Sequence, residues 1–231
     1  MKKTLFVIVI ALAALATASA ATREEMPEVE IFGGYSLLKL GASNDKIRPF
    51  QEELYEGAGD KWNADSTSFF LSRGAAGSLA FNLNEYFSIV ADARYNQGDL
   101  IKGSFELISP ETSTTIRTPL VVGVKNLSVL TGPRISLRKK QGTAFVHALA
   151  GLDYWRLNGD YTVAGEEISE GGDKFGPGVA IGGGLDVNVN EKFAVRVIQA
   201  DYYLTRQMER FMNNVNLSFG IVLRIGEKVL R

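Results

Sequence analysis

The chain has 231 residues, with 25 basic and 26 acidic side chains, one histidine and no cysteine. The absence of cysteine excludes disulfides, thiolate metal sites and a lipid attached to a cysteine. The nearly balanced charge argues against nucleic acid as a partner. A chain of this length fits a single domain.

Residues 1–20 have the three parts of a secretory signal peptide. Two lysines come first, an apolar run follows over 5–16, and Ala18-Ser19-Ala20 provides a small-residue cleavage site. The apolar run is too short to span a bilayer, and nothing later approaches the roughly 20 apolar residues that a membrane helix needs. We therefore expect residues 21–231 to form one domain whose membrane spans are β-strands.

Eight later segments alternate, or nearly alternate, between apolar and polar or small residues. Successive side chains of a strand point to opposite faces, so each segment predicts a strand with one apolar face. The clearest is the last, in which every second residue from Val215 to Ile225 is apolar. The segments cover 28–40, 69–82, 87–95, 127–138, 144–155, 178–189, 193–204 and 214–226.

The seventh segment breaks phase. In strict alternation, Gln199 and Asp201 would lie on the same face as the apolar Val195 and Val197. Arg196 would lie on the same face as the apolar Ile198. A β-bulge near Ile198 would return the polar side chains to the inner face.

The connections alternate between short and long, as in outer-membrane barrels. The short turns lie at 82–85, 139–142 and 190–192, and the long loops at 41–68, 96–125, 156–177 and 205–213. Aromatic residues flank both kinds of connection, where interface girdles are expected: Phe81, Phe87 and Phe193 beside the short turns, and Tyr95, Tyr154 and Tyr202 beside the long loops. With the signal peptide, this pattern predicts an all-β fold, an eight-stranded antiparallel up-and-down transmembrane β-barrel with both termini periplasmic.

Five motifs resemble the OmpA-like outer-membrane β-barrel domain family of Gram-negative bacteria. They are Gly132–Ser136, Ala144–Ala148, Gly182–Asp186, Val197–Tyr202 and Asn213–Val222. The similarity covers nearly all of the mature chain and is strongest over 125–226. It implies the fold, the outer-membrane location and insertion by the barrel-insertion machinery, but no activity, because the family hosts many roles. In two departures from the family pattern, we expect no peptidoglycan-binding domain after the barrel and so carry over no wall-anchoring role, and the sequence runs past Ile225-Gly226 into Glu227–Arg231 instead of a terminal aromatic residue.

The expected inner face is rich in charges of both signs. An eight-stranded barrel is filled by its own side chains, and charges removed from water must pair. We therefore expect a salt-bridged plug, with a narrow pore for small solutes as the alternative. The inward set is Glu30, Asp92, Arg94, Arg134, Arg138, His147, Asp153, Asp186, Arg196 and Arg224. Strand pairing should also make Glu30 and Arg224 neighbours.

His147, the only histidine, is the natural candidate for acid–base chemistry. The turn at 139–142 sets it opposite Arg134, and a neighbouring arginine disfavours a protonated imidazole. We interpret His147 as a neutral member of the lumen network and expect no enzyme, because a lipid-modifying barrel needs a serine–histidine pair that lipid can reach. Gly182-Gly183-Gly184 lacks the strand–helix setting of a nucleotide loop and indicates a thin patch of wall.

Two further groups of charges are candidate sites. Asp160, Glu166, Glu167, Glu170 and Asp173 could hold a hard cation, but their spacing fits no metal-binding loop, and we expect a solvated loop with no metal or cofactor. Alternation places the Arg73 side chain on the outer face near the outer rim, where it could contact lipopolysaccharide phosphates.

These observations favour a non-enzymatic outer-membrane barrel with a structural or surface-interaction role through four extracellular loops. We expect a monomer in contact with outer-membrane lipid and lipopolysaccharide, and the loop partner is unknown. A soluble lipocalin-like carrier would need an apolar lumen, whereas the lumen expected here is charged. On the lipid face, Ile221 and Val129 should lie at mid-bilayer.

Overall fold

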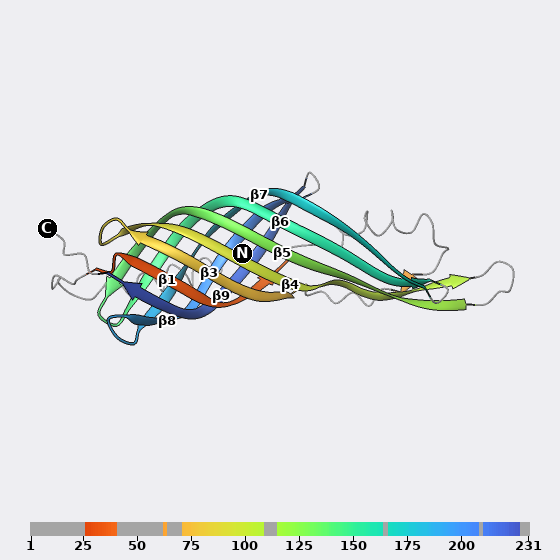
Figure 1. The fold of residues 1–231 in the computed structure, drawn as a ribbon, viewed down its shortest axis with the longest axis horizontal. Coiled ribbons are helices and arrows are strands. Elements are labelled where there is room, and N and C mark those ends of the chain that lie inside the picture. Colours follow the sequence, from red (N-terminus) through yellow and green to blue (C-terminus); the bar gives the residue numbers. More distant parts are fainter. Residues whose placement is uncertain are drawn as a thin grey trace, which may run out of the picture.

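The protein was analysed as a computed structural model, which describes residues 26–40, 62–63, 71–108, 115–163, 166–207 and 210–226. The predicted signal peptide at 1–20 lies outside these ranges. The described residues form nine strands (Figure 1). They are β1 (Val29–Lys39), β2 (Trp62–Asn63), β3 (Leu71–Asn82), β4 (Phe87–Ile108), β5 (Thr115–Lys139), β6 (Gly142–Val163), β7 (Glu166–Asn188), β8 (Phe193–Gln207) and β9 (Arg210–Ile225). No described segment is a helix long and apolar enough to cross a membrane.

Eight of these strands close into an antiparallel barrel, which confirms the predicted fold. The ring runs β4-β3-β1-β9-β8-β7-β6-β5 and closes by pairing β5 with β4, while the two-residue β2 pairs only with β4. Consecutive strands are neighbours, as in an up-and-down barrel. Closure leaves no unpaired sheet edge in the part that crosses the membrane.

The pairing of β1 with β9 joins the two ends of the described chain. Glu30 lies directly opposite Arg224, as the sequence predicted, and Ser36 lies opposite Ser218. The turn after β5 pairs Arg138 with Thr143, and the same register places Arg134 opposite His147, also as predicted.

The predicted bulge is present in β8. Arg196 pairs with Gly220 and Gln199 with Ser218, so the two residues between them on β8 face a single residue of β9. Val197 and Ile198 are both exposed on the outer face, whereas Arg196, Gln199 and Asp201 are buried. The extra residue therefore restores the inward direction of the polar side chains that follow.

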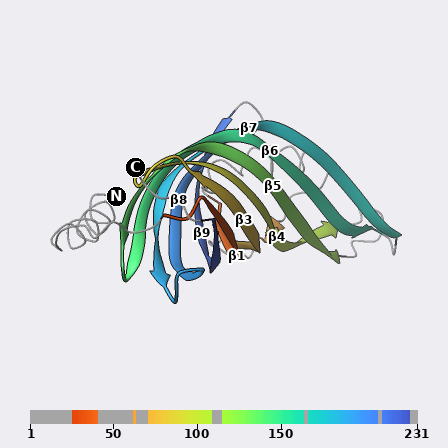
Figure 2. The ribbon, with the colours of Figure 1, turned by 60° about the vertical axis from the view of Figure 1, so that its left-hand side comes forward.

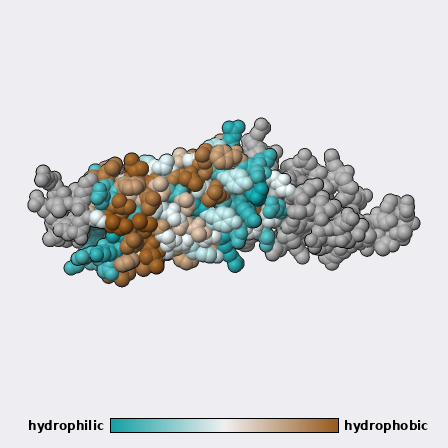
Figure 3. All heavy atoms as spheres, viewed as in Figure 1, coloured by the Kyte–Doolittle hydropathy of each residue, from teal (hydrophilic) through white to brown (hydrophobic). Residues whose placement is uncertain are grey.

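The outer face of the barrel strands is largely apolar between the short turns and the charged row at the other end. Val129 is 55% exposed and Ile221 is 59% exposed, whereas the chain neighbour of Ile221, Val222, is 0% exposed. Figure 3 shows these apolar side chains gathered in a band with hydrophilic side chains on both sides of it. An apolar belt bordered by polar ends is what a bilayer requires of a barrel wall.

Four strands, β4 to β7, run well past the outer ends of the others (Figures 1 and 2). β4 and β5 stay paired as far as Ile108 and Thr115, and β6 and β7 as far as Val163 and Glu166. We call this part of the sheet, residues 98–108, 115–124, 157–163 and 166–176, the outer extension.

The structure corrects three predicted loops, because most of the described residues in 96–125, 156–177 and 205–213 are strand. The first two contribute to the outer extension, and the third belongs to β8 and β9. Only Trp62 and Asn63 of the loop at 41–68 are described in this region, and they pair with Phe105 and Ser104. Alternation did not identify these strands, because neither face of a strand beyond the bilayer contacts lipid and so neither face has to be apolar. Pairing continues because strands already aligned in the barrel extend without a new loop-closure cost.

Candidate functional site: the barrel lumen

The structure places all ten predicted lumen residues on the inner face. Eight are buried, and Arg138 and Arg224 are half-buried near the short turns. Asp201, which the sequence analysis placed inside but did not include in the network, is buried with them. Among the residues that the structure describes, the lumen thus carries five arginines and five carboxylates. The acidic members are Glu30, Asp92, Asp153, Asp186 and Asp201.

One ion pair spans the lumen at its centre. Arg94 on β4 holds Asp92 of its own strand, with 2.6 Å between Nε and Oδ1, and reaches Asp201 on β8, with 2.6 Å between Nη2 and Oδ2. β4 and β8 are four strands apart in both directions around the ring, so this contact joins opposite walls. All three side chains are at most 1% exposed.

His147 also contacts Asp201, with 2.7 Å between Nε2 and Oδ1. The two residues belong to β6 and β8, and Gly182 of β7 lies between them in the same row of the sheet. A Cβ atom at Gly182 would lie 2.0 Å from Asp201 Oδ1. The middle strand therefore needs glycine at this position, which gives the Gly182-Gly183-Gly184 patch a packing role.

A second ion pair lies beside this central group. Arg196 donates to both oxygens of Asp186, at 2.8 and 3.1 Å, and to Gln199 Oε1 at 2.7 Å. Its guanidinium carbon lies 4.2 Å from the ring centre of Phe32 and 4.5 Å from that of Phe145. Paired oxygens and two aromatic faces hold this arginine in one orientation.

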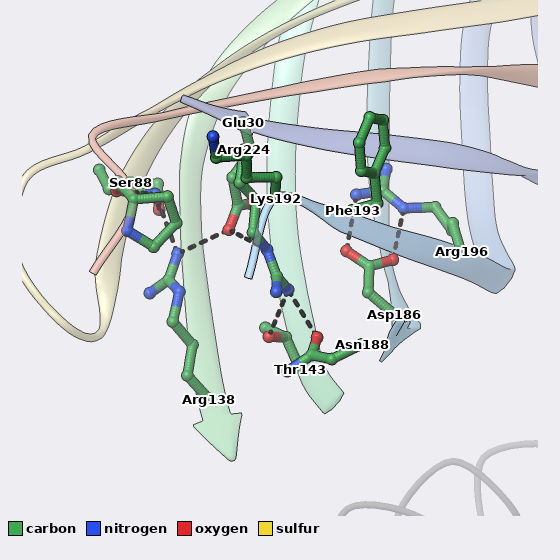
Figure 4. Close-up of polar contacts among 12 residues, drawn as sticks. Glu30, Ser88, Arg138, Thr143, Asp186, Asn188, Lys192, Phe193, Arg196 and Arg224 are labelled. Atoms are coloured by element: carbon green, nitrogen blue, oxygen red, sulfur yellow. Dashed lines mark hydrogen bonds and ion pairs between the residues drawn. The ribbon is translucent and has the colours of Figure 1, made fainter. Parts of the chain in front are cut away.

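The end of the lumen near the short turns holds three arginines around one carboxylate. Figure 4 shows two of them, Arg138 and Arg224, beside Glu30. Arg134 Nη2 donates to Glu30 Oε2, Arg138 Nη2 lies 3.4 Å from Glu30 Oε1, and Arg224 Nε lies 3.9 Å from the same oxygen. We call these four residues the turn-side cluster. Glu30 and Arg224 are therefore neighbours, although Arg134 is the closer partner of Glu30.

Neutral acceptors complete the hydrogen bonds of the turn-side cluster. Arg138 Nη2 donates to Asn82 Oδ1 at 2.7 Å, and Arg224 Nη2 donates to Asn188 Oδ1 at 2.8 Å and to Thr143 Oγ1 at 3.3 Å. The sequence analysis did not predict these amide and hydroxyl partners. Alternation indicated only that their side chains point inward.

Toward the outer end, the lumen is less charged than predicted. Asn126 Nδ2 donates to Asp153 Oδ1 at 2.5 Å, and Trp155 Nε1 donates to the other carboxylate oxygen. Ten buried side chains around them form an apolar cluster that the sequence analysis did not anticipate. They are Leu38, Leu40, Ala80, Val90, Val124, Leu130, Leu149, Trp155, Ala180 and Tyr203.

The outward charges near the outer rim form a continuous row. Strand pairing connects Arg73, Gln97, Lys125, Arg156 and Asp173 across β3 to β7, and all five are exposed. Arg156 Nε donates to Asp173 Oδ1 at 2.9 Å. The next outward row toward the turns includes Tyr95, Tyr154 and Phe175.

The proposed acidic cation group falls mostly on side chains outside the described set. Of its members, only Asp173 is described, and it pairs with Arg156. Among the described residues, no three acidic or histidine side chains are placed together to hold a metal ion.

No curated protein sequence gave a significant match. The fold is similar to that of Ail, the attachment invasion locus protein of Yersinia pestis, with 15% identity, a TM-score of 0.48, and coverage of 86% of this chain and 100% of that chain. Neisserial surface protein A gives 9% identity, a TM-score of 0.45, and coverage of 86% and 97%.

The N-terminal β-barrel domain of Pseudomonas aeruginosa OprF is also similar, with 11% identity, a TM-score of 0.38, and coverage of 85% of this chain and 98% of that chain. The profile of one protein family matches residues 8–224, which is almost the whole chain. The chain therefore belongs to the outer membrane protein β-barrel domain family.

Proposed function

We propose that this outer-membrane barrel is a closed, non-enzymatic protein that presents its outer extension for interactions at the cell surface. The observation that carries this proposal is a contrast in the structure. The Arg94–Asp201 ion pair crosses the lumen, while four strands continue beyond the barrel as a paired sheet. A filled lumen favours a scaffold, and an extended sheet offers area for contact.

The plug is favoured over a narrow pore by the packing of the lumen. Arg94, Asp201 and Gln199 are each at most 2% exposed, and the apolar cluster lies in the same lumen. A pore of eight strands would need these side chains to move, because so few strands leave little space between the walls.

The environment of His147 supports a non-enzymatic role. Its imidazole is buried, it contacts Asp201, and its ring centre lies 5.7 Å from that of Phe145. A nucleophile that acts on lipid must be reachable from the outer face. His147 points inward, and we assign it to the plug.

The orientation follows from the connections. We infer that the short turns and both termini are periplasmic and that the outer extension faces the cell exterior, since outer-membrane barrels place short turns on the periplasmic side. We expect the barrel to be inserted by the barrel-insertion machinery and to remain a monomer.

Arg73 supports a contact with lipopolysaccharide. It is exposed at the outer end of β3, and it starts the row in which the outward residues change from aromatic to charged. An arginine fork pairs well with phosphate oxygens. Arg73→Gln should weaken binding of lipopolysaccharide to the micellar protein, and Lys140→Gln, on a short turn, should not.

Conductance separates the plug from the pore. The purified protein in a planar bilayer should pass no steady current, because its central ion pair joins opposite walls. Stable ohmic current from the unmodified protein would reject the plug and favour the pore.

The surface role is tested by shortening the outer extension. Lys102 pairs with Val121, so replacing residues 103–120 by Asn-Gly closes a two-residue hairpin between aligned strands. Fluorescent liposomes carrying the parent should be captured by some members of a panel of immobilised polysaccharides and proteins. Liposomes carrying the shortened variant should lose that capture while the barrel stays folded. Equal capture by both, or capture no better than that of empty liposomes, would contradict the role.

A further inference from the structure

The turn-side cluster has more positive charge than its described surroundings neutralise. Arg134, Arg138 and Arg224 share Glu30, which is the only acidic side chain among the described residues that forms an ion pair with any of them. Three positive charges against one negative leave an excess of 3 − 1 = +2. Asp186, the next carboxylate, is held by Arg196 through two hydrogen bonds.

The same three arginines retain unused donors. The Nε atoms of Arg134, Arg138 and Arg224 are buried, and none has a hydrogen-bond partner in the structure. The neutral oxygens of Asn82, Asn188 and Thr143 engage Nη2 atoms but carry no charge. A buried donor without a partner is costly, and an excess of buried charge is more so.

Two arginines of the cluster are partly exposed at the end of the barrel. Arg134 and Glu30 have side chains that are 3% exposed, but those of Arg224 and Arg138 are 9% and 14% exposed. Arg138 also donates to the backbone oxygen of Glu85 in the short turn after β3, at 2.5 Å. In Figure 4, Arg138 reaches from the end of β5 toward Glu30. Arg224 extends past Glu30 to Thr143 and Asn188, which adjoin short turns.

We propose that this turn-side mouth of the lumen binds a phosphate group. Guanidinium groups match phosphate oxygens in shape and in charge, and phosphate near neutral pH carries about the charge that the cluster lacks. Its oxygens would accept from the free Nε donors, while Glu30 keeps the arginines oriented. The phosphate comes either from free inorganic phosphate or from a phospholipid headgroup at the same end. This site goes beyond the surface role and does not depend on it.

The test titrates inorganic phosphate into the full-length protein in an uncharged, phosphate-free maltoside detergent at constant ionic strength. Binding is followed by calorimetry and by broadening of the phosphorus resonance. The parent should show saturable binding, and Arg138→Gln should weaken it about tenfold or more, as expected for losing a hydrogen bond between charged groups. Arg138 is chosen because it is half-buried at the mouth, so the variant should fold.

The matched control is Arg156→Gln, which removes the same charge from the exposed row at the outer rim and should leave phosphate binding unchanged. Glu30→Gln raises the excess charge to +3 and should tighten binding if that variant folds. Absence of saturable binding by the parent, or equal weakening by Arg138→Gln and Arg156→Gln, would overturn the site.

The source of the phosphate is distinguished in vesicles of phosphatidylcholine, a zwitterionic phospholipid whose surface does not repel inorganic phosphate. If the site takes a lipid headgroup, the lipid should compete, so inorganic phosphate should bind more weakly in vesicles than in micelles. If it takes free phosphate, the two affinities should agree. Either result supports the site, provided that Arg138→Gln still weakens binding in micelles.

Discussion

On β9, Ile221 meets lipid and Val222 meets the lumen, with exposed fractions of 59% and 0%. The outer neighbours of Ile221 need only be apolar, because fluid hydrocarbon has no fixed shape to match. Inside, Arg94, His147 and Gln199 each contact Asp201 through a particular atom. The lipid face is therefore constrained by residue class, and the lumen face by residue pairs.

The largest effect should come from breaking one of these pairs. Arg196→Ala would leave Asp186 as a buried carboxylate without its arginine, with an expected cost of about 3–5 kcal/mol. Unfolding in urea from liposomes measures this loss, and planar bilayers should show a leakier barrel. The double variant Arg196→Ala/Asp186→Ala should recover part of the stability, since no buried charge is left alone. If the double variant lost as much free energy of unfolding as the two single variants lose together, stabilisation of the lumen by ion pairs would be contradicted.

A charge on the lipid face should have the next largest effect. Ile221→Arg should cost about 2–4 kcal/mol if the residue lies near the bilayer centre. Val189→Arg is the matched control, because Val189 is 66% exposed on a short turn near the interface, where the cost falls to about 0–1 kcal/mol. The same unfolding measurement checks both, and equal losses would show that depth in the membrane has been misassigned.

A smaller effect should come from added volume on the two faces. Gly182→Ala forces a methyl group against Asp201 and should cost about 1–3 kcal/mol by overpacking. Gly33→Ala adds the same methyl group where nothing lies within 4 Å, and it should change the free energy of unfolding little. If Gly33→Ala were the more harmful of the two, the contrast between the faces would fail.

The sequence was enough to predict which residues face inward. Alternation located all eight barrel strands, and the length of the turn at 139–142 placed Arg134 opposite His147. Both results depend on local geometry, because the period of a strand and the length of a turn can be read from neighbouring residues. Alternation also predicted the bulge in β8, because one extra residue is the simplest way to return the polar side chains after the interruption to the inner face.

The partners inside the lumen could not be predicted in this way. Arg94 and Asp201 are 107 positions apart and meet across the barrel, which depends on side-chain reach and on the tilt of the strands. The absence of a side chain at Gly182 was equally decisive, and nothing in the pattern indicated that His147 would reach across it. The outer extension was missed because its strands lie beyond the bilayer that imposes alternation.

The bulge in β8 also bears on how the strand tolerates insertions and deletions. Removing Ile198 would leave Val197 opposite Phe219, with Arg196 still opposite Gly220 and Gln199 opposite Ser218. The shortened strand would alternate without interruption and keep every side chain on its present face. At most other positions in a barrel strand, the loss of one residue would turn all later side chains over. The length of β8 can therefore change by one residue at this point, and the barrel around it need not adjust.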